Sequence, residues 1–172
     1  AKVAVVNLQE IAELSAEGKA DRDKIQVLLN KEQADLAAKA KALQDNQTKL
    51  AQSGSLLSET ARDQLQKEID RQTVENQRSQ QDARSAVNEL QNELQNDFQR
   101  KLMPVLAQMA QEKGLHMLLS AQDACVIWPA PGIDLTREAV KRFDTAVAAS
   151  AKPGPATAPA PAAAKPAAPA NP

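Results

Sequence analysis

Leucine recurs at every seventh position through part of the first third of the chain, and this repeat restricts the fold more than any other feature. The repeated positions are Leu29, Leu36, Leu43, Leu50 and Leu57. An apolar residue at this interval returns to nearly the same face of a helix and forms the seam of a supercoil. The pattern predicts one long helix that begins after Gly18 and packs against a partner helix.

The partner helix follows directly in the sequence, where apolar residues recur in steps of mostly three and four. They are Leu65, Ile69, Ala83, Val87, Leu90, Leu94, Phe98 and Leu102. Between the two stripes, Gly54 is expected to end the first helix in a left-handed conformation, and Ser58 is expected to cap the second. We therefore predict a helical hairpin over residues 19–113, with its tip near residues 53–58. At about 1.5 Å per residue, each helix would be about 60 to 80 Å long.

Polar residues interrupt the second stripe at its middle. Gln72, Asn76 and Gln80 occupy positions where the pattern calls for apolar side chains. Because apolar burial is the main source of stability in such a seam, we expect the two helices to be held together loosely at mid-length. Pro104 lies near the end of the second helix and lacks a backbone donor, which predicts a bend near residues 100–103. We interpret this bend as a hinge, with a static bend needed only for packing as the equal alternative.

The two ends of the chain, residues 1–18 and 114–149, are expected to form a small body with short strands and helices. The segment KVAVVNL predicts a strand, after which Asn7 caps a helix with Glu10 three residues later. Gly114 is expected to stop the long helix, and LHMLLSA predicts a second strand. After PAPG, the hydroxyl group of Thr136 is expected to cap a closing helix.

The segment CVIW predicts a third strand that is covered on both faces. In this strand Cys125 and Ile127 would face one side, and Val126 and Trp128 would face the other. Trp128 would then pack under the closing helix or against a neighbouring subunit, a reading favoured over a ligand-stacking role. Cys125 either forms a disulfide between chains or stays a free buried thiol, and a single cysteine on a short strand favours the thiol.

This body is too small to anchor two such long helices alone. A core of some 50 residues is marginal and leaves strand edges open, so we expect several copies of the chain to share one sheet. Folding should then depend on protein concentration. The residues expected at the contacts between subunits are Val3, Val5, Leu118, Val126, Ile127 and Trp128.

The terminal segments are expected to lie outside the fold. Residues 150–172 are nearly all alanine and proline, which predicts a disordered, solvated tail. The sequence begins at Ala1 without a methionine, and a removed secretory signal peptide is the origin we expect. No apolar run approaches the roughly 20 residues that a membrane-spanning helix needs.

Catalytic and nucleic-acid-binding functions fit the sequence poorly. His116 is the only histidine and falls in an apolar strand pattern, and a His116 and Cys125 pair lacks the other ligands that zinc requires. No glycine-rich phosphate loop is present, so we expect neither enzyme activity nor a cofactor. The net charge of −1 provides no basic surface for nucleic acid.

The chain resembles the family of the periplasmic chaperone Skp, also called OmpH, over nearly its whole length up to about Ala149. The resemblance rests on the order and spacing of four segments: KVAVVNLQEI, LSETARDQLQKEI, KLMPVLAQMAQEKGLHMLLS and VIWPAPGIDLTREAVKRF. It implies a mostly helical α+β fold, a jellyfish-like homotrimer whose small β-barrel body is shared by three subunits. It also implies a periplasmic holdase that keeps unfolded outer-membrane proteins in a cavity between its arms, without ATP.

The charge of the arms departs from the basic members of that family. Residues 19–49 carry seven basic and five acidic side chains, and residues 59–112 carry seven and ten. A basic cavity is therefore not expected, and binding to a lipid or lipopolysaccharide surface stays open. Leu56 and Leu57 at the tip are the expected client contacts. The alternative function is a structural coiled-coil hairpin, a scaffold or adaptor of the cell envelope.

Overall fold

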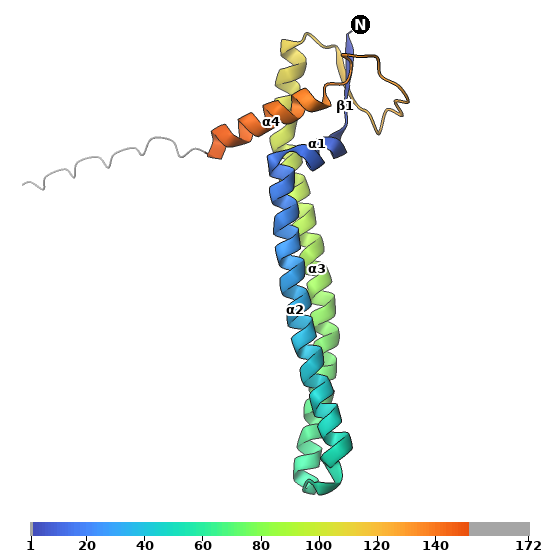
Figure 1. Ribbon diagram of the computed structural model, residues 1–172, viewed down its shortest axis with the longest axis vertical. Helices are drawn as coiled ribbons and strands as arrows, with labels where there is room; N and C mark the ends of the chain where they lie inside the picture. Colours follow the sequence, from blue (N-terminus) through green and yellow to red (C-terminus); the bar gives the residue numbers. More distant parts are fainter. Residues whose placement is uncertain (1, 152–172) are drawn as a thin grey trace, which may run out of the picture.

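The computed structural model describes residues 2–151 and shows a long two-helix hairpin that projects from a small body (Figure 1). The chain runs in and out of the body once, so that both ends of the described chain lie there and the tip is the farthest point. The elements in chain order are β1 (Val3–Val6), α1 (Leu8–Leu14), α2 (Ala16–Ser53), the short 3-10 helix η1 (Gly54–Leu56), α3 (Glu59–Glu112), β2 (Met117–Ser120) and α4 (Thr136–Ala151).

The hairpin consists of α2 and α3, as the leucine repeat predicted. With 38 and 54 residues, the helices are about 57 and 81 Å long. The additional turns of α3 extend past the start of α2 into the body. Most seam leucines are half-buried and Leu29 is exposed, because a pair of helices leaves the flanks of its seam open. The hairpin alone therefore has no fully enclosed core along most of its length.

The tip confirms one capping prediction and corrects the other. The hydroxyl group of Ser58 accepts a hydrogen bond from the backbone N–H of Ala61 at 3.2 Å, as a helix cap should. Gly54, however, has φ −59° and ψ −32°, which is right-handed helical backbone. The chain turns through η1 instead, and the guanidinium group of Arg62 donates two hydrogen bonds to the Gly54 carbonyl oxygen. No left-handed residue is needed because Arg62 satisfies this carbonyl.

The body is built around two parallel strands from opposite ends of the chain. Val3 pairs with Met117 and Val6 with Ser120. On the other side of β1, the backbone of Val5 exchanges hydrogen bonds with Ile133 and Leu135. Gly114, with φ +60°, directly follows the last turn of α3 and lets the chain turn into β2, as predicted.

The hydrophobic core lies where this small sheet, α1 and α4 meet the last turns of α3. Phe98 and Phe143 pack edge to face with ring centroids 5.1 Å apart. Around them are Ala4, Val6, Ile11, Leu102, Leu106, Met109, Leu135 and Ala139. The root of the arm is thus part of the core, since Phe98 and three residues around it, Leu102, Leu106 and Met109, belong to α3.

The CVIW segment is not a strand in this structure, which overturns the prediction that both of its faces are covered. β2 ends at Ser120, and turns follow at residues 121–125, where Cys125 has φ 51°, and at residues 131–133, with irregular backbone between them. Ile127 is 99% and Trp128 75% exposed, so Trp128 does not pack under α4. Cys125 is exposed as well, so it is not a buried thiol. A short apolar run forms a strand only beside a partner. Within the described chain β1 is already paired on both sides and residues 125–128 do not pair with the remaining edge of β2, while Pro129 and Pro131 lack donors.

The start of α4 also differs from the prediction. Thr136 is the first residue of α4, and its backbone N–H donates to the carboxylate of Asp134 at 2.9 Å. The Thr136 hydroxyl group instead accepts a hydrogen bond from the backbone N–H of Asn7, also at 2.9 Å. At its other end α4 continues to Ala151, so two residues of the predicted tail are helical. The remaining tail, 152–172, lies outside the described residues.

Candidate functional site

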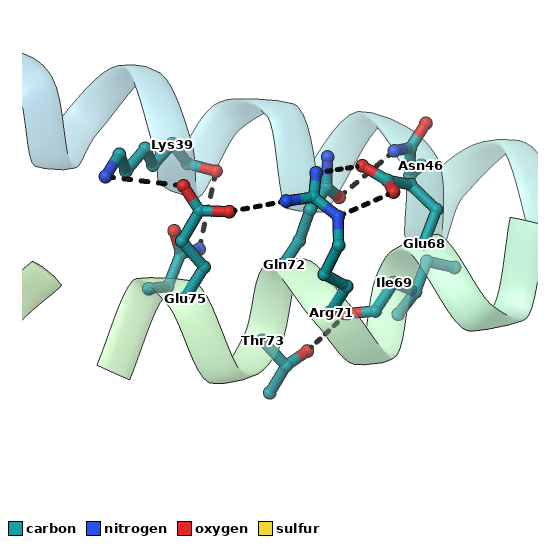
Figure 2. Close-up of polar contacts among 9 residues, drawn as sticks. Lys39, Asn46, Glu68, Ile69, Arg71, Gln72, Thr73 and Glu75 are labelled. Atoms are coloured by element: carbon teal, nitrogen blue, oxygen red, sulfur yellow. Dashed lines mark hydrogen bonds and ion pairs between the residues drawn. The ribbon is translucent and has the colours of Figure 1, made fainter. Parts of the chain in front are cut away.

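The middle of the hairpin carries a polar belt, which we define as Lys39, Asn46, Gln72, Glu75, Asn76 and Ser79. Figure 2 shows Lys39, Asn46, Gln72 and Glu75 of this belt. The ammonium group of Lys39 donates to the Ser79 hydroxyl at 2.6 Å and lies 3.5 Å from the Glu75 carboxylate. The Asn46 amide donates to the Gln72 side chain at 3.0 Å. At this level, hydrogen bonds between α2 and α3 replace apolar packing. The sequence indicated the polar positions of Gln72 and Asn76 but not these hydrogen bonds, and Gln80 is exposed instead of lying in the seam.

Arg71 adds a chain of ion pairs along α3 beside the belt. It contacts Glu68 at 2.7 Å and Glu75 at 2.8 Å, one turn away on either side (Figure 2). The hydrogen bond from Arg71 lowers the pKa of Glu68 below its ordinary value of 4.5. Because all three side chains face solvent, these pairs stabilise α3 only slightly. Glu75 also contacts Lys39 and therefore connects this series of ion pairs to α2.

An open groove, the arm groove, runs along one side of the hairpin between α2 and α3. Its part nearer the tip is lined by apolar residues such as Leu29, Leu36 and Val87. Its part at the root has a volume of about 600 Å³ and is lined by Ile25, Leu94, Phe98, Leu102 and Met103, among others. Helical spacing places both parts on the same side of the helix pair, because the lining residues of each helix follow one another in steps of three and four.

The corner between α1 and α2 fixes the direction in which the arm leaves the body. Ser15 is fully buried and its hydroxyl group accepts a hydrogen bond from the backbone N–H of Gly18 at 3.1 Å. The guanidinium group of Arg22 donates to the carbonyl oxygens of Ala12 and Glu13 in the last turn of α1. The carboxylate of Asp144 in α4 accepts from the Ala16 backbone N–H at 2.8 Å. The start of α2 is therefore held by α1, by α4 and by its own cap residue Ser15.

Ion pairs connect the end of α3 to α4. Arg142 contacts both Glu112 and Glu138, and Lys113 lies 2.9 Å from Glu138. The hydrogen bond from Arg142 is the main cause that lowers the pKa of Glu112, and the one from Lys113 is the main cause for Glu138. We call these four residues the α3–α4 clamp.

The predicted site residues divide into buried and exposed groups. Val5 is buried and Leu118 packs against the core of its own chain, while Val126 is half-buried. Val3, Ile127 and Trp128 are exposed on the body, and Leu56 at the tip is 85% exposed with Leu57 half-buried. Met117 was missed by sequence reasoning and is also exposed. It pairs with Val3 in the β1–β2 register, so the two side chains lie on the same face of the sheet, and only the register reveals this.

Neither a metal site nor a membrane-spanning helix is found in the described part of the chain. Within residues 2–151, no three histidine, cysteine, aspartate or glutamate side chains are grouped so that they could hold a metal ion. None of the described helices is both long and apolar enough to cross a membrane. The Nδ1 atom of His116 accepts a hydrogen bond from the Lys2 backbone N–H at 3.0 Å, which gives this histidine a structural contact.

Comparison with known proteins identifies the family. The family model described as "Outer membrane protein (OmpH-like)" matches residues 2–143. The chain belongs to the OmpH-like family. No curated protein matches the sequence.

A solved structure has the same fold as this OmpH-like chain. It is a candidate outer membrane chaperone (OmpH-like) from Caulobacter crescentus CB15, with 19% sequence identity and a TM-score of 0.78. The match covers 84% of each chain. At this identity the likeness concerns the fold alone, and it extends over the arm and body together. The hairpin on a small body is therefore shared with another OmpH-like protein.

Pro104 lies in the root of the OmpH-like arm, within a helix that continues unbroken from Glu59 to Glu112. Leu102 and Leu106 on either side of it are buried in the core, whereas Met103 is exposed in the arm groove. One turn before it, Lys101 contacts Glu17 of α2 and Asp97 of α3. Pro104 lies at the junction of arm and body, and both the bend and the hinge expected there stay predictions.

Proposed function

We propose that this OmpH-like protein is an ATP-independent holdase chaperone of the periplasm. It binds unfolded outer-membrane β-barrel proteins between its helical arms and prevents their aggregation, with no chemical step. The observation that carries the proposal is an arm of about 60 Å or more that projects from a body of only a few short elements, in a chain that the OmpH-like family model matches over residues 2–143. A globular core does not need helices of this length.

The proposed working form is a homotrimer whose bodies pack together. The exposed side chains of Val3, Met117, Ile127 and Trp128 support this arrangement, because a monomer would leave them in water. The outer edge of β2 is a second point of support, since it has no strand partner within the described chain. In the trimer, residues 126–128 would acquire the neighbouring strand that they lack in a single chain.

The client contacts are proposed to be apolar and uncharged polar groups of the arms. Leu56 and Leu57 at the tip are part of this set, as are the residues of the arm groove. The near balance of basic and acidic residues in both helices argues against a general electrostatic mechanism. A lipid or lipopolysaccharide surface is correspondingly a weaker candidate partner than an unfolded polypeptide.

Light scattering tests this function directly. A urea-denatured outer-membrane β-barrel protein is diluted into buffer with and without the full-length chain, at one trimer per client and without ATP. We expect the chain to suppress the rise in scattering. Scattering that rises unchanged would overturn the holdase proposal and favour a coiled-coil scaffold, which has no reason to bind unfolded chains.

A further inference from the structure

The arm groove has two chemically different components, an apolar floor and a rim of carboxamide side chains. Leu94, Phe98 and Leu102 of α3 are half-buried or buried and form part of the floor. The α3 rim consists of exposed side chains at steps of three and four: Gln80, Arg84, Asn88, Gln91, Gln95 and Gln99. Five of these six residues carry a carboxamide group.

The carboxamide groups of this rim are free to bind a ligand. Several other glutamines of the chain, such as Gln66 and Gln108, donate to a carboxylate one turn away. By contrast, Gln91, Gln95 and Gln99 make no side-chain hydrogen bond to any part of residues 2–151 that the structure describes. Each carboxamide group can therefore donate and accept at the same time.

Charged side chains of α3 lie mainly away from this rim. Glu89, Glu93 and Asp97 are each offset by two residues from a rim glutamine, which is about 200° around the helix. On α2, Asp21 is held by Lys24 at 3.1 Å, and Arg22 is engaged with the carbonyl oxygens of α1. The root half of the groove therefore presents mostly carboxamide and apolar groups.

The spacing of the rim matches the backbone of an extended polypeptide. Gln91, Gln95 and Gln99 are four residues apart, so their positions repeat about every 6.0 Å along the helix. An extended chain repeats about every 6.6 Å for two residues, and every second N–H and C=O pair points to the same edge. The difference of about 0.6 Å per step is small compared with the reach of a glutamine side chain, which has three rotatable bonds.

The length of the groove also fits one segment of a specific kind. From Gln80 to Met103 the lining residues span 23 positions, or about 35 Å of helix. A membrane-spanning β-strand has about 9–11 residues, and ten extended residues measure about 33 Å. Such strands alternate apolar and polar side chains, so the apolar ones would face the floor while the backbone edge faces the rim.

We propose that the arm groove binds one extended, alternating apolar and polar segment of an unfolded outer-membrane β-barrel protein, and that Gln91, Gln95 and Gln99 hydrogen-bond to its backbone. This proposal rests on the holdase function and adds the conformation in which a client segment is held. Recognition of the backbone does not depend on client sequence, so one groove serves many clients. Hydrogen bonding to the rim also occupies one backbone edge of the bound client segment. Two unfolded barrel segments with free edges would otherwise pair and aggregate.

The test uses the full-length chain and a fluorescein-labelled ten-residue peptide of alternating valine and threonine with terminal lysines. Fluorescence anisotropy measures its dissociation constant for the natural sequence and for the triple variant Gln91→Ala, Gln95→Ala and Gln99→Ala. A net hydrogen bond changes a dissociation constant by about two- to tenfold. We therefore expect the triple variant to bind at least about tenfold more weakly. Because these positions are exposed and alanine favours helix, the arm should keep its fold.

The matched control replaces three exposed α3 glutamines outside the groove: Gln64→Ala, Gln77→Ala and Gln81→Ala. This variant should bind the peptide within about twofold of the natural chain. A second probe needs no protein variant. It is the same peptide with methyl groups on four backbone nitrogens, two on each edge. This peptide keeps its side chains but lacks four backbone N–H donors. We expect the natural chain to bind the N-methylated peptide about as weakly as the triple variant binds the unmodified one.

Two results would overturn the proposal: equal binding by the natural chain and the triple variant, or equal binding of the unmodified and N-methylated peptides. Scattering suppression by the natural chain is measured in parallel. If suppression persists while peptide binding is insensitive to both changes, backbone recognition is wrong and the holdase function stands. If the natural chain fails to suppress scattering, the proposed function itself is wrong.

Discussion

At the scale of single residues, Gly18 has the least space for a side chain among the described glycines. It lies in the first turn of α2, where α1 ends against it. A Cβ atom at this position would lie 1.8 Å from the carbonyl oxygen of Ala12, a distance at which backbone must move. The same turn is held by the buried Ser15 hydroxyl group, so it has little freedom to shift. The corner between α1 and α2 therefore depends on the absence of a side chain here.

Gly18→Ala is expected to lower the free energy of unfolding by about 2 to 3 kcal/mol, because it forces the two helices apart. Urea denaturation at a fixed protein concentration measures this change. The matched control is Gly54→Ala, where a Cβ atom would meet only the Leu50 side chain at 3.5 Å and φ is already −59°. That change should be neutral or stabilise by up to about 1 kcal/mol. A Gly18→Ala protein as stable as the control would contradict this account of the corner.

At the scale of elements, the α3–α4 clamp makes the body sensitive to acid. The pKa values of Glu112 and Glu138 are both lowered in the folded chain by Arg142 and Lys113. A carboxyl group with a lowered pKa contributes stability above its unfolded pKa and loses it as the pH falls through the folded value. Both groups have an ordinary pKa of 4.5, so the contribution is complete at neutral pH, begins to decline near that value and is lost as the pH falls through the lowered pKa values of the folded chain.

Arg142→Ala should therefore destabilise the body at pH 7 and have a smaller effect as the pH falls below the ordinary carboxyl range. Thermal unfolding of both proteins between pH 7 and pH 3 measures this difference. NMR titration provides a second measurement, in which the pKa of Glu112 should rise toward 4.5 in the variant. The effect should weaken with added salt, because the clamp is exposed. A difference in stability that stays constant across this pH range would show that Arg142 acts through packing alone.

Pro104 is the element-scale feature that bears on arm movement. Pro104→Ala adds the missing backbone donor within an otherwise continuous helix and should stiffen the root of α3. We expect the variant to suppress aggregation of small clients normally and of large clients less well, as measured by light scattering with two barrel proteins of different size. The α1–α2 corner is unchanged in this variant, which isolates the contribution of α3. Equal suppression of both clients would leave Pro104 with a packing role only.

The sequence predicted those elements whose causes are local. The leucine repeat, the caps at Asn7 and Ser58 and the stop at Gly114 depend on residues within a few positions, and the structure contains each of them. The errors concern contacts that no pattern of neighbouring residues indicates. The Thr136 hydroxyl group accepts a hydrogen bond from the backbone N–H of Asn7, 129 residues away, and no local pattern indicates this contact. Gly54 is right-handed because Arg62 reaches its carbonyl oxygen.

The site was predictable to a similar extent. The polar interruption at Gln72 and Asn76 was visible in the sequence, but their partners on α2 required the register of the hairpin. The CVIW segment has the composition of a strand, yet a strand also requires a neighbour. Periodicity shows which face of a helix is apolar but not where a flank remains open. For this reason the arm groove and its carboxamide rim emerged only from the structure.

At the scale of the whole molecule, the exposed body surface predicts association. The double substitution Ile127→Ser and Trp128→Ser should shift the protein toward monomers. It removes two large exposed apolar side chains, and neither residue belongs to the hydrophobic core of the subunit. Sedimentation velocity over a range of concentrations measures the distribution. Leu56→Ser at the tip is the control and should leave the association unchanged, since Leu56 is exposed far from the body (Figure 1). A natural chain that stays a folded monomer at micromolar concentration would contradict the trimer.

The balance of charge over the arms predicts how the holdase responds to salt. Residues 19–49 have a net charge of +2 from seven basic and five acidic side chains, and residues 59–112 have −3 from seven and ten. The Debye length falls from about 10 Å at 0.1 M to about 3 Å at 1 M ionic strength, which abolishes long-range attraction to a charged client. Nearly neutral arms have little such attraction to lose, and salt does not weaken the burial of apolar groups. Suppression of scattering should therefore be nearly equal at 0.1 M and 1 M sodium chloride.

The control is a variant with added basic charge, Gln64→Lys, Gln77→Lys and Gln81→Lys, whose extra binding to an acidic client should disappear at high salt. If the natural chain loses its suppression in 1 M salt, electrostatic attraction rather than the apolar and carboxamide surface holds the client.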